Sequence, residues 1–562
     1  MAAAGTAATT SSAPKRRTAE FHESVWGDFF IIHVPQTDEV VNSWNEQIEV
    51  LKSNIAGMLS SPTDNQTLNL IDLIERLGVD YHFEDEIERI LRQEYVKITS
   101  DGDNYNDDDF YTVALRFRLL RQHGCNVSSD IFKRFKTSDH ERDEFKQEMI
   151  SDVEGMLSLY EAAYLRTHGE SILDEAIAFT KPHLTAAAGA EDLKLADSTL
   201  AERIAHALKW PHRKGMKRVE HHFFISIYEQ TQGHDEALLK LAKLSFNVVQ
   251  HLYQKELRVL TKWWIELDLP KRTSYARDKL VEVYFWAMGC LWKPKYSLAR
   301  YCFTRVTTVG SVYDDTYDAY GTIEELEKFT AAIHRWDTSM QDVEPKMKII
   351  FEAITDSYDT IHEMAKEEFG RSYCWDYGKP ALKNAVRLYL EEARWLDKNY
   401  VPTLEEYRRV SSLSTLYQWV AFAAFCGMGE SASQEVFDWL FTEPKLLVAS
   451  SEHCRLMDDV VSHEFEQDRG HSPSSVECYM KQYGVSRKEA IDALTDLVEE
   501  NWKIINGELL NPPAHVSKEI LLIFLGFAQI MEALYADGDG YTNSETTTKD
   551  MLTALLVTPF HV

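Results

Sequence analysis

The feature that most limits the fold of this chain is its shortage of residues that interrupt helices. It has 24 glycines and 15 prolines among 562 residues, well below the roughly 12% share that these two residues usually have together. Apolar residues recur at helical spacing, as at Leu70, Ile74 and Leu77, and Gly78 follows as a C-cap. No stretch alternates apolar and polar residues for long enough to build a sheet. The sequence therefore predicts an all-α fold made of long helices.

The balance of charge argues against a protein that binds polyanions. Lys and Arg number 60 and Asp and Glu 90, which gives a formal net charge of −30. Contact with a phosphate backbone or an anionic membrane needs clustered cations, so we expect no nucleic-acid partner. The longest apolar runs, Trp419–Met428 and Ile520–Ala528, reach about half of the roughly 18 residues that a membrane span needs. We interpret both as buried helices and expect no stable membrane insertion.

Two features bear on the cellular compartment. The seven cysteines are scattered without CxxC pairs, an odd and sparse set that suits a reducing environment. Residues 1–15 are small and polar and contain no apolar stretch typical of a signal peptide. We therefore expect a cytoplasmic protein, and one that works as a monomer.

The chain is predicted to divide near residues 230–240, where the segment QTQGH at 230–234 interrupts two helical stretches. The two parts would have roughly 200 and 320 residues, each enough to bury a core of its own. We predict an N-terminal helical domain at residues 36–235 and a C-terminal one at residues 236–562. The basic run HRKGMKR at 212–218 is expected to be a solvated helix end.

The first group of chemically informative residues is acidic. Asp314, Asp315 and Asp318 lie in the segment VYDDTYD. On a helix Asp314 and Asp318 are one turn apart and Asp315 is three residues from Asp318, so the carboxylates share one face. A hard cation such as Mg²⁺, which prefers carboxylate, water and phosphate oxygens, would offset their repulsion. A DDxxD pattern alone is weak evidence, because acidic clusters are commonly only solvated surface.

A second oxygen-rich stripe follows later in the chain. Asp458, Ser462 and Glu466 are four residues apart from one another and therefore lie along one side of a helix. Apolar residues surround this stripe, as suits a helix that lines a cavity. Two carboxylate stripes on separate helices are strong evidence for a metal-dependent site.

Basic residues accompany both stripes. Arg277 and Lys279 precede the aromatic segment Tyr284–Trp286, and Arg455 lies one turn before Asp458. Such side chains are ordinarily surface ion-pair partners. Beside two metal-binding stripes they become candidates for receiving the negative charge of a departing diphosphate.

In combination these motifs resemble those of plant class I terpene synthases, and of the sesquiterpene synthases most of all. The resemblance runs over nearly the whole chain and rests on RRx8W at Arg16, Arg17 and Trp26, FRLLRQHG at 117–124, LRTHGESILDEA at 165–176, DDTYDAYGT at 314–322, the second metal motif at 458–466 and DGYT at 539–542. One departure is Lys279, because the family usually has Arg-Asp-Arg where this chain has Arg-Asp-Lys. Lysine keeps the charge but lacks the planar guanidinium, which predicts a looser grip on diphosphate.

The resemblance implies two helical domains. The C-terminal one would be a class I terpenoid synthase bundle around a deep apolar pocket, and the N-terminal one a barrel-like helical domain. Protonation-type cyclases with such a barrel need a DxDD motif, which the first half of this sequence lacks, so the N-terminal domain should be catalytically silent. Residues 1–35 would form a tail that caps the active site with Arg16 and Arg17 and helps to exclude water.

The resemblance also implies a reaction on a prenyl diphosphate. Three Mg²⁺ ions, for which Mn²⁺ could substitute, would be held by Asp314, Asp315, Asp318, Asp458, Ser462 and Glu466, with Asp314, Asp318 and Asp458 also facing the substrate. The ions would help to pull diphosphate from the substrate, and the carbocation would then cyclise in the pocket. The remaining roles fall to Arg277, Lys279 and Arg455 at the diphosphate, Trp286, Tyr535 and Tyr541 at the cation, and Ser414, Thr415 and Leu416 at a helix break in the pocket wall.

Several alternatives remain open from sequence. Farnesyl diphosphate is the favoured substrate, while a monoterpene synthase acting on geranyl diphosphate is the alternative. A chain-elongating prenyltransferase shares the DDxxD logic but carries two aspartate-rich motifs, whereas the second motif here has the Asp/Ser/Glu form. A non-catalytic helical scaffold would leave both metal stripes unexplained.

Overall fold

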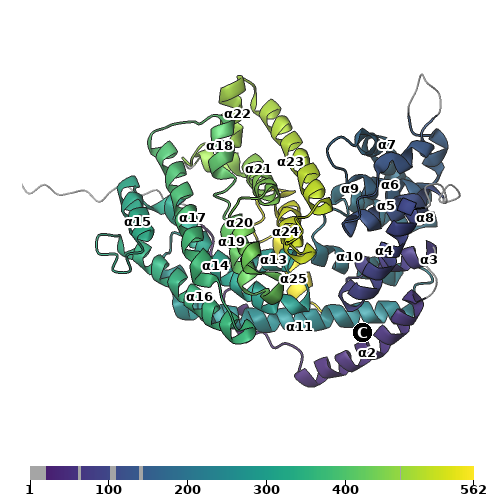
Figure 1. The fold of residues 1–562 in the computed structure, drawn as a ribbon, viewed down its shortest axis with the longest axis horizontal. Coiled ribbons are helices and arrows are strands. Elements are labelled where there is room, and N and C mark those ends of the chain that lie inside the picture. The colour runs from purple at the N-terminus through teal and green to yellow at the C-terminus, as the bar shows by residue number, and fades with distance from the viewer. Residues whose placement is uncertain (1–20, 61–64, 101–108, 138–143, 469) are drawn as a thin grey trace, which may run out of the picture.

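The computed structural model describes residues 21–60, 65–100, 109–137, 144–468 and 470–562 as helices joined by turns and loops (Figure 1). Within these ranges there is no strand, and the one sheet-like contact is an isolated antiparallel bridge between Lys136 and Phe145. The expected all-α fold is confirmed.

The N-terminal helices, apart from the short α1, gather at the right of Figure 1. They are α1 (Phe29–Ile32), α2 (Asp38–Leu59), α3 (Asn65–Arg76), η1 (Asp80–His82), α4 (Glu84–Ser100), α5 (Phe110–Gln122), η2 (Ser129–Phe135), η3 (Gln147–Ser151), α6 (Val153–Ala163), α7 (Ser171–Gly189), α8 (Glu191–Ala196), α9 (Ser198–Lys209) and α10 (Lys217–Gln230). Helix α3 buries Ile71 and Ile74, and Gly78 follows it with φ of +69°, the left-handed conformation of a C-terminal stop. The predicted helix end is therefore present.

The C-terminal helices fill the left and centre of Figure 1. They are α12 (Leu269–Arg272), α13 (Leu280–Cys290), η4 (Pro294–Tyr296), α14 (Ser297–Asp315), the π-helix η5 (Thr316–Tyr320), α15 (Ile323–Arg335), α16 (Pro345–Phe369), α17 (Cys374–Asp397), α18 (Leu404–Ser411), α19 (Tyr417–Cys426), η6 (Gly429–Ser431), α20 (Gln434–Leu440), α21 (Lys445–Asp468), α22 (Ser475–Tyr483), α23 (Arg487–Leu510), α24 (Lys518–Tyr535) and α25 (Thr547–Leu556). Every residue of α19 is buried, and α24 lies among the central helices. The two long apolar runs are therefore buried helices, as expected.

Helix α11 (Glu236–Leu267) connects the two groups. The interruption predicted at 230–234 is present, because α10 ends at Gln230 and the Asp235 side chain caps α11 by accepting from Leu238 N at 2.9 Å. Its 32 residues span about 48 Å, and it runs across the lower part of the molecule, with α2 below it at the right (Figure 1). It packs against α2 and α10 on one side of the division and against α13, α14 and α25 on the other.

The basic run at 212–218 was expected to be solvated, and this expectation is wrong. The side chains of Arg213, Lys214 and Arg218 are buried. Lys214 Nζ lies 2.5 Å from Glu499 of α23, and Arg213 Nε donates to Asn506 Oδ1 of the same helix at 2.9 Å. The run reads as polar, but the Lys214 ammonium is paired with a carboxylate of α23, and the Arg218 guanidinium carbon lies 4.0 Å from the ring centre of Phe246 in α11. These contacts with distant parts of the chain make the burial possible.

Candidate functional site

A pocket opens among the C-terminal helices, and nearly all the sequence-predicted residues meet in it. Its walls come from α13, α14, η5, α17, the α18–α19 connection, α21, α24 and the segment that follows α24. The predicted residues that line it are Arg277, Trp286, Asp314, Asp315, Asp318, Ser414, Thr415, Leu416, Arg455, Asp458, Ser462, Glu466, Tyr535 and Tyr541. Lys279 does not line it.

The first acidic motif lies where α14 passes into a π-helical turn. Asp314 and Asp315 end α14, and Asp318 belongs to η5. A π-helical turn is wider than an α-helical one and is common at functional sites, and here it sets where Asp318 lies relative to Asp314. Burial and the neighbouring Asp318 carboxylate raise the pKa of Asp314 to about 7, while Arg277 opposes the rise.

Arg277 connects this motif to the end of the chain. Its backbone N donates to Asp315 Oδ2 at 2.7 Å, and its Nη2 lies 2.7 Å from Asp314 Oδ2 and 2.9 Å from Asp315 Oδ1. Its Nη1 donates to Thr542 Oγ1 at 3.3 Å, and its guanidinium carbon lies 5.3 Å from the ring centre of Tyr541. Asp315 is thus occupied with holding Arg277.

The second motif follows one side of α21. Asp458, Ser462 and Glu466 all line the pocket, and the Ser462 hydroxyl is buried without a hydrogen-bond partner among the described residues. Burial raises the pKa of Asp458 well above its usual value, and the charges of Glu466 and Asp539 add to the rise. This side of the pocket therefore holds several carboxylates and an unsatisfied hydroxyl oxygen.

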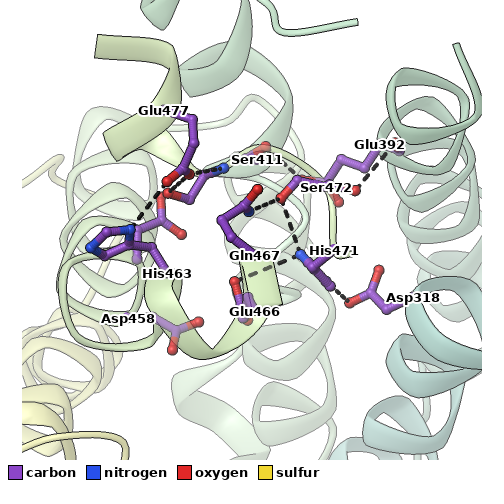
Figure 2. A network of polar contacts seen from close by, with 12 residues as sticks. Asp318, Glu392, Ser411, Asp458, His463, Glu466, Gln467, His471, Ser472 and Glu477 are labelled. Carbon is purple, nitrogen blue, oxygen red and sulfur yellow. Dashed lines mark hydrogen bonds and ion pairs between the residues drawn. The ribbon is translucent and has the colours of Figure 1, made fainter. Parts of the chain in front are cut away.

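His471 lies between the two motifs, as Figure 2 shows. Its Nε2 is 3.1 Å from Asp318 Oδ2, and its Nδ1 is 3.6 Å from Glu466 Oε2. The ring is supplied by the segment between α21 and α22. It makes the closest described contact between the first and second acidic motifs.

Arg455 approaches the pocket from α21 and meets the break between α18 and α19. Its Nε donates to Ser411 O at 3.1 Å, and its Nη2 donates to Ser414 Oγ at 3.3 Å. The Ser414 hydroxyl in turn donates to the buried Glu392 carboxylate at 3.0 Å. Leu416 closes the break with φ of +66°, an uncommon conformation for a residue with a branched side chain. The helix break predicted at 414–416 is present.

Aromatic rings form the apolar part of the wall. Trp286 meets Tyr541 edge to face at 5.5 Å between ring centres and Tyr417 at 6.4 Å. Tyr541 shares a hydrogen bond of 2.9 Å with Ser311, which leaves its ring on the pocket surface. Tyr535 and Phe303 continue the wall. These faces are suited to a cationic or apolar guest.

Lys279 was predicted to contact the diphosphate, and the structure places it elsewhere. It is 4% exposed, donates to Ser544 Oγ at 3.0 Å and lies 3.6 Å from Glu282 Oε1. The Ser544 hydroxyl itself donates to Glu282 at 2.5 Å. Lys279 therefore fastens the C-terminal segment that carries Tyr541 to the start of α13. The motif position indicated charge but could not show which way the side chain points.

The tail motif is described only in part. Arg16 and Arg17 lie outside the described residues. Trp26 is buried and packs on Phe29 and Phe30 at 5.6 Å between ring centres. Phe21 lines the pocket, and its ring centre lies 5.3 Å from the Arg277 guanidinium carbon.

Asp539, His471 and Tyr389 are among the pocket residues that were not singled out as site residues from sequence. Asp539 accepts from Tyr541 N and Thr542 N at 3.0 and 2.8 Å and faces the second motif, and its position within DGYT was the available signal. His471 could have been noticed as a polar ring five residues after Glu466. Tyr389 on α17 had no signal, because one tyrosine among 26 is ordinarily core.

The chain matches two family models. Residues 25–208 match the terpene synthase N-terminal domain, and residues 265–504 match the metal-binding domain of the terpene synthase family.

In the described part of the chain no helix combines the length and apolar content that crossing a bilayer requires.

Relatives resemble the chain along its full length. It is 48% identical to probable terpene synthase 3 of Ricinus communis over 97% of both chains. It is 45% identical to (−)-germacrene D synthase of Vitis vinifera over 97% of this chain and 96% of that one. It is 46% identical to sesquiterpene synthase 2 of Toona sinensis over 97% of both.

Solved structures also resemble the chain along nearly its whole length. A limonene synthase crystallised with 2-fluorolinalyl diphosphate matches with a TM-score of 0.90 and 31% identity over 97% of this chain and 100% of that one. Isoprene synthase from grey poplar (Populus x canescens), in complex with three Mg²⁺ ions and dimethylallyl-S-thiolodiphosphate, matches with a TM-score of 0.84 and 29% identity over 96% and 99%. With two acidic motifs facing one aromatic pocket and this likeness along its whole length, the chain belongs to the terpene synthase family.

Proposed function

We propose that this chain catalyses the Mg²⁺-dependent ionisation and cyclisation of farnesyl diphosphate to a sesquiterpene, with release of diphosphate. The observation that carries the proposal is that α14–η5 and α21 bring two acidic motifs to the mouth of one pocket whose deeper wall is aromatic. The relatives named as germacrene D synthase and sesquiterpene synthase support the choice of substrate class.

The side chains at the pocket mouth fit Mg²⁺. The candidate donors are oxygen atoms, which hard cations prefer. The unpartnered Ser462 hydroxyl and the raised pKa of Asp314 and of Asp458 are the features that a bound cation would relieve. No group of three His, Cys, Asp or Glu side chains in the described ranges could hold an ion by itself. Mg²⁺ commonly uses one or two carboxylates together with water and phosphate oxygens, so paired carboxylates suit an ion that arrives with diphosphate.

We assign the metal-holding role to Asp314 and Asp318 on one side and to Asp458, Ser462 and Glu466 on the other, with Asp315 supporting through Arg277. Three ions are proposed by analogy with the isoprene synthase complex, and Mn²⁺ is proposed as a substitute. When bound, Mg²⁺ supplies Lewis-acid polarisation of the diphosphate oxygens.

The basic residues of the chain would receive the leaving group. The guanidinium of Arg277 lies beside the first motif and that of Arg455 beside the second. Both present planar donors that can take two phosphate oxygens at once. Their present contacts with carboxylates and with the helix break hold them at the pocket mouth, so they are in place before the diphosphate is released.

The deeper wall would guide the carbocation. The faces of Trp286, Tyr417 and Tyr541 offer cation–π attraction of the order of 2 kcal/mol in a desolvated site. The break at 414–416 interrupts helical hydrogen bonding, so its carbonyl groups are candidates for facing the cation. The burial of these groups keeps water from capturing the cation.

We propose further that residues 236–562 form the catalytic domain, that residues 36–235 are catalytically silent, and that residues 1–35 cap the active site. Among the described residues that line the pocket, all except Phe21 come from the C-terminal part. We also propose that the protein acts as a monomer. The seven free thiols suit a reducing compartment, and we propose the cytoplasm. Light scattering and fluorescent tagging test the last two points.

A single assay separates the candidate activities. Purified protein is incubated with Mg²⁺ and either farnesyl or geranyl diphosphate, and volatile products are identified by gas chromatography and mass spectrometry. A cyclic sesquiterpene that forms faster from farnesyl diphosphate supports the proposal. Preferential turnover of geranyl diphosphate would favour a monoterpene synthase, longer prenyl diphosphates in the presence of isopentenyl diphosphate would favour a prenyltransferase, and no Mg²⁺-dependent release of diphosphate would favour a scaffold.

A further inference from the structure

We propose that His471 is a positioning residue of this site, which ties the first acidic motif to the second and holds them at the separation at which Mg²⁺ and diphosphate bind. The proposal rests on the function proposed above. It assigns a role to a side chain that belongs to neither motif and that comes from the connection between α21 and α22.

The imidazole ring is surrounded by oxygen atoms from three directions (Figure 2). Nε2 lies 3.1 Å from Asp318 Oδ2 on the η5 side. Nδ1 lies 3.6 Å from Glu466 Oε2 and 3.3 Å from Ser472 O. The side chain is only 15% exposed. The ring therefore occupies the space between the two carboxylates instead of projecting from the surface.

The segment that carries the ring is fastened at both ends. His471 N donates to Glu466 O at 3.0 Å, and Gln467 Nε2 donates to Ser472 O at 3.0 Å, so the segment is anchored to the end of α21. Gly470 turns the chain with φ of +74°, a conformation that favours glycine. On the other side Ser472 Oγ donates to Glu392 O of α17 at 3.4 Å. These contacts fix the ring in place before any ligand arrives.

The electrostatics of the pocket explain why such a tie is useful. Burial raises the pKa of Asp314 and of Asp458, and repulsion adds to both shifts, from Asp318 on Asp314 and from Glu466 and Asp539 on Asp458. Without a cation the carboxylates within each motif therefore repel one another. The Nε2 atom of His471 offers the Asp318 carboxylate a polar partner in place of another negative charge, while the backbone N of His471 donates to Glu466 O and so joins the residue to the end of α21.

The tie is compatible with metal binding. A carboxylate has two oxygens with several lone pairs, so a contact of Asp318 Oδ2 with His471 does not by itself prevent the same carboxylate from holding an ion. Hydrogen-bond partners of metal ligands commonly change metal affinity 10- to 100-fold when they are removed. Direct ligation by the ring is disfavoured, because imidazole suits Zn, Cu, Fe and Ni, whereas Mg²⁺ prefers oxygen.

Two substitutions distinguish the hydrogen-bonding role from packing. His471→Phe keeps a ring of similar size but removes both nitrogens. His471→Gln keeps an N–H donor near the position of Nε2, and so should keep the contact with Asp318. The exposed His515 provides a control, His515→Gln, that lies outside the pocket.

The test measures metal binding without turnover. Mn²⁺ serves as a paramagnetic stand-in for Mg²⁺ and is titrated into the full chain in the presence of inorganic diphosphate, with free Mn²⁺ followed by electron paramagnetic resonance. We expect His471→Phe to weaken binding by about 10- to 100-fold, His471→Gln to remain within a few fold of wild type, and His515→Gln to match it. Far-UV circular dichroism of each variant verifies that it is folded.

The outcomes separate this inference from the proposed function. Asp314→Asn is included as a variant of a proposed metal ligand. If wild type and Asp314→Asn bind Mn²⁺ equally, the proposed metal site is wrong. If Asp314→Asn binds less tightly but His471→Phe binds as wild type or more tightly, the metal site stands and the role given to His471 is overturned. Equal weakening in His471→Gln and His471→Phe overturns the hydrogen-bonding role as well.

Discussion

Replacing Lys279 with methionine probes the fastening of the C-terminal segment. The change removes an ammonium that donates to Ser544 and lies 3.6 Å from Glu282, where the two ionic side chains are 4% and 0% exposed. Removing one partner of a buried ion pair typically costs 3–5 kcal/mol. Because the Ser544 hydroxyl still donates to Glu282, we expect the lower end, about 3 kcal/mol of unfolding free energy. The loss in kcat/KM, expressed as a free energy, should be smaller than this loss of unfolding free energy, since Lys279 does not line the pocket.

The pH dependence of this loss has a definite sign. Burial raises the pKa of Glu282, and Lys279 opposes the rise, so the variant should raise that pKa further. A carboxyl group whose pKa is raised in the folded state destabilises the protein when it is ionised. This destabilisation disappears as pH falls through the folded-state pKa toward the pKa that the group has in the unfolded state. The stability difference between wild type and Lys279→Met should therefore shrink between pH 7.5 and pH 5, by up to about 1.4 kcal/mol per pH unit.

Urea unfolding, followed by tryptophan fluorescence and by circular dichroism, measures the loss. Lys488→Met is the matched control, because that lysine side chain is 84% exposed and its loss should change stability by less than about 0.5 kcal/mol. Adding Glu282→Gln to Lys279→Met should restore part of the stability, since it removes the unpaired charge. The reasoning would be refuted by a Lys279→Met variant that is as stable as wild type but has a tenfold higher KM, since that result would mean contact with the diphosphate.

Three further predictions follow from other parts of the molecule. Asp314→Asn and Glu466→Gln should each remove most Mg²⁺-dependent release of diphosphate, and normal turnover at limiting Mg²⁺ would contradict this. The unfolding midpoint in EDTA should stay unchanged or rise, because each substitution removes a carboxylate that lies among other carboxylates. Gly427→Ala should destabilise the protein by about 2 kcal/mol, because its Cβ would lie 2.4 Å from the backbone N of Ala299, and an unchanged thermal midpoint would count against it. Burial lowers the pKa of His453 to about 4, so this residue should reduce stability as pH falls from 6.5 toward 4, by about 1.4 kcal/mol per pH unit. His453→Phe should flatten the dependence of the urea midpoint on pH, and an equally steep profile in this variant would argue against the lowered pKa of His453.

Much of the site could be predicted because its chemistry is periodic. Carboxylates one helical turn apart at Asp314 and Asp318, and again along α21, must share a face whatever the rest of the chain does. Sequence could not show the direction of Lys279, because a charge at a motif position can point to the pocket or to a buried partner such as Glu282. Nor could it show His471, whose place between two motifs depends on how α21 and η5 pack.

The same distinction holds for the fold. Helices and their ends are set by local spacing and capping, as at Gly78 and Asp235, and these were predictable. The burial of the run at 212–218 was not, because the partner of its Lys214 is Glu499, on a helix nearly three hundred residues further along the chain. Sequence reasoning therefore works for features set within a few turns and fails where the partner is distant.

The packing of α2 on α11 also has a consequence for the growing chain on the ribosome. The buried residues Val41, Ile48 and Ile55 repeat every seven positions and form one apolar stripe on α2, which faces a helix that begins only at Glu236. At 5–20 residues per second, roughly 10–40 s pass between the synthesis of the two helices. Throughout that interval the stripe lacks its partner, so the nascent N-terminal part is the stage at which aggregation competes with folding and at which chaperones would have most effect on yield.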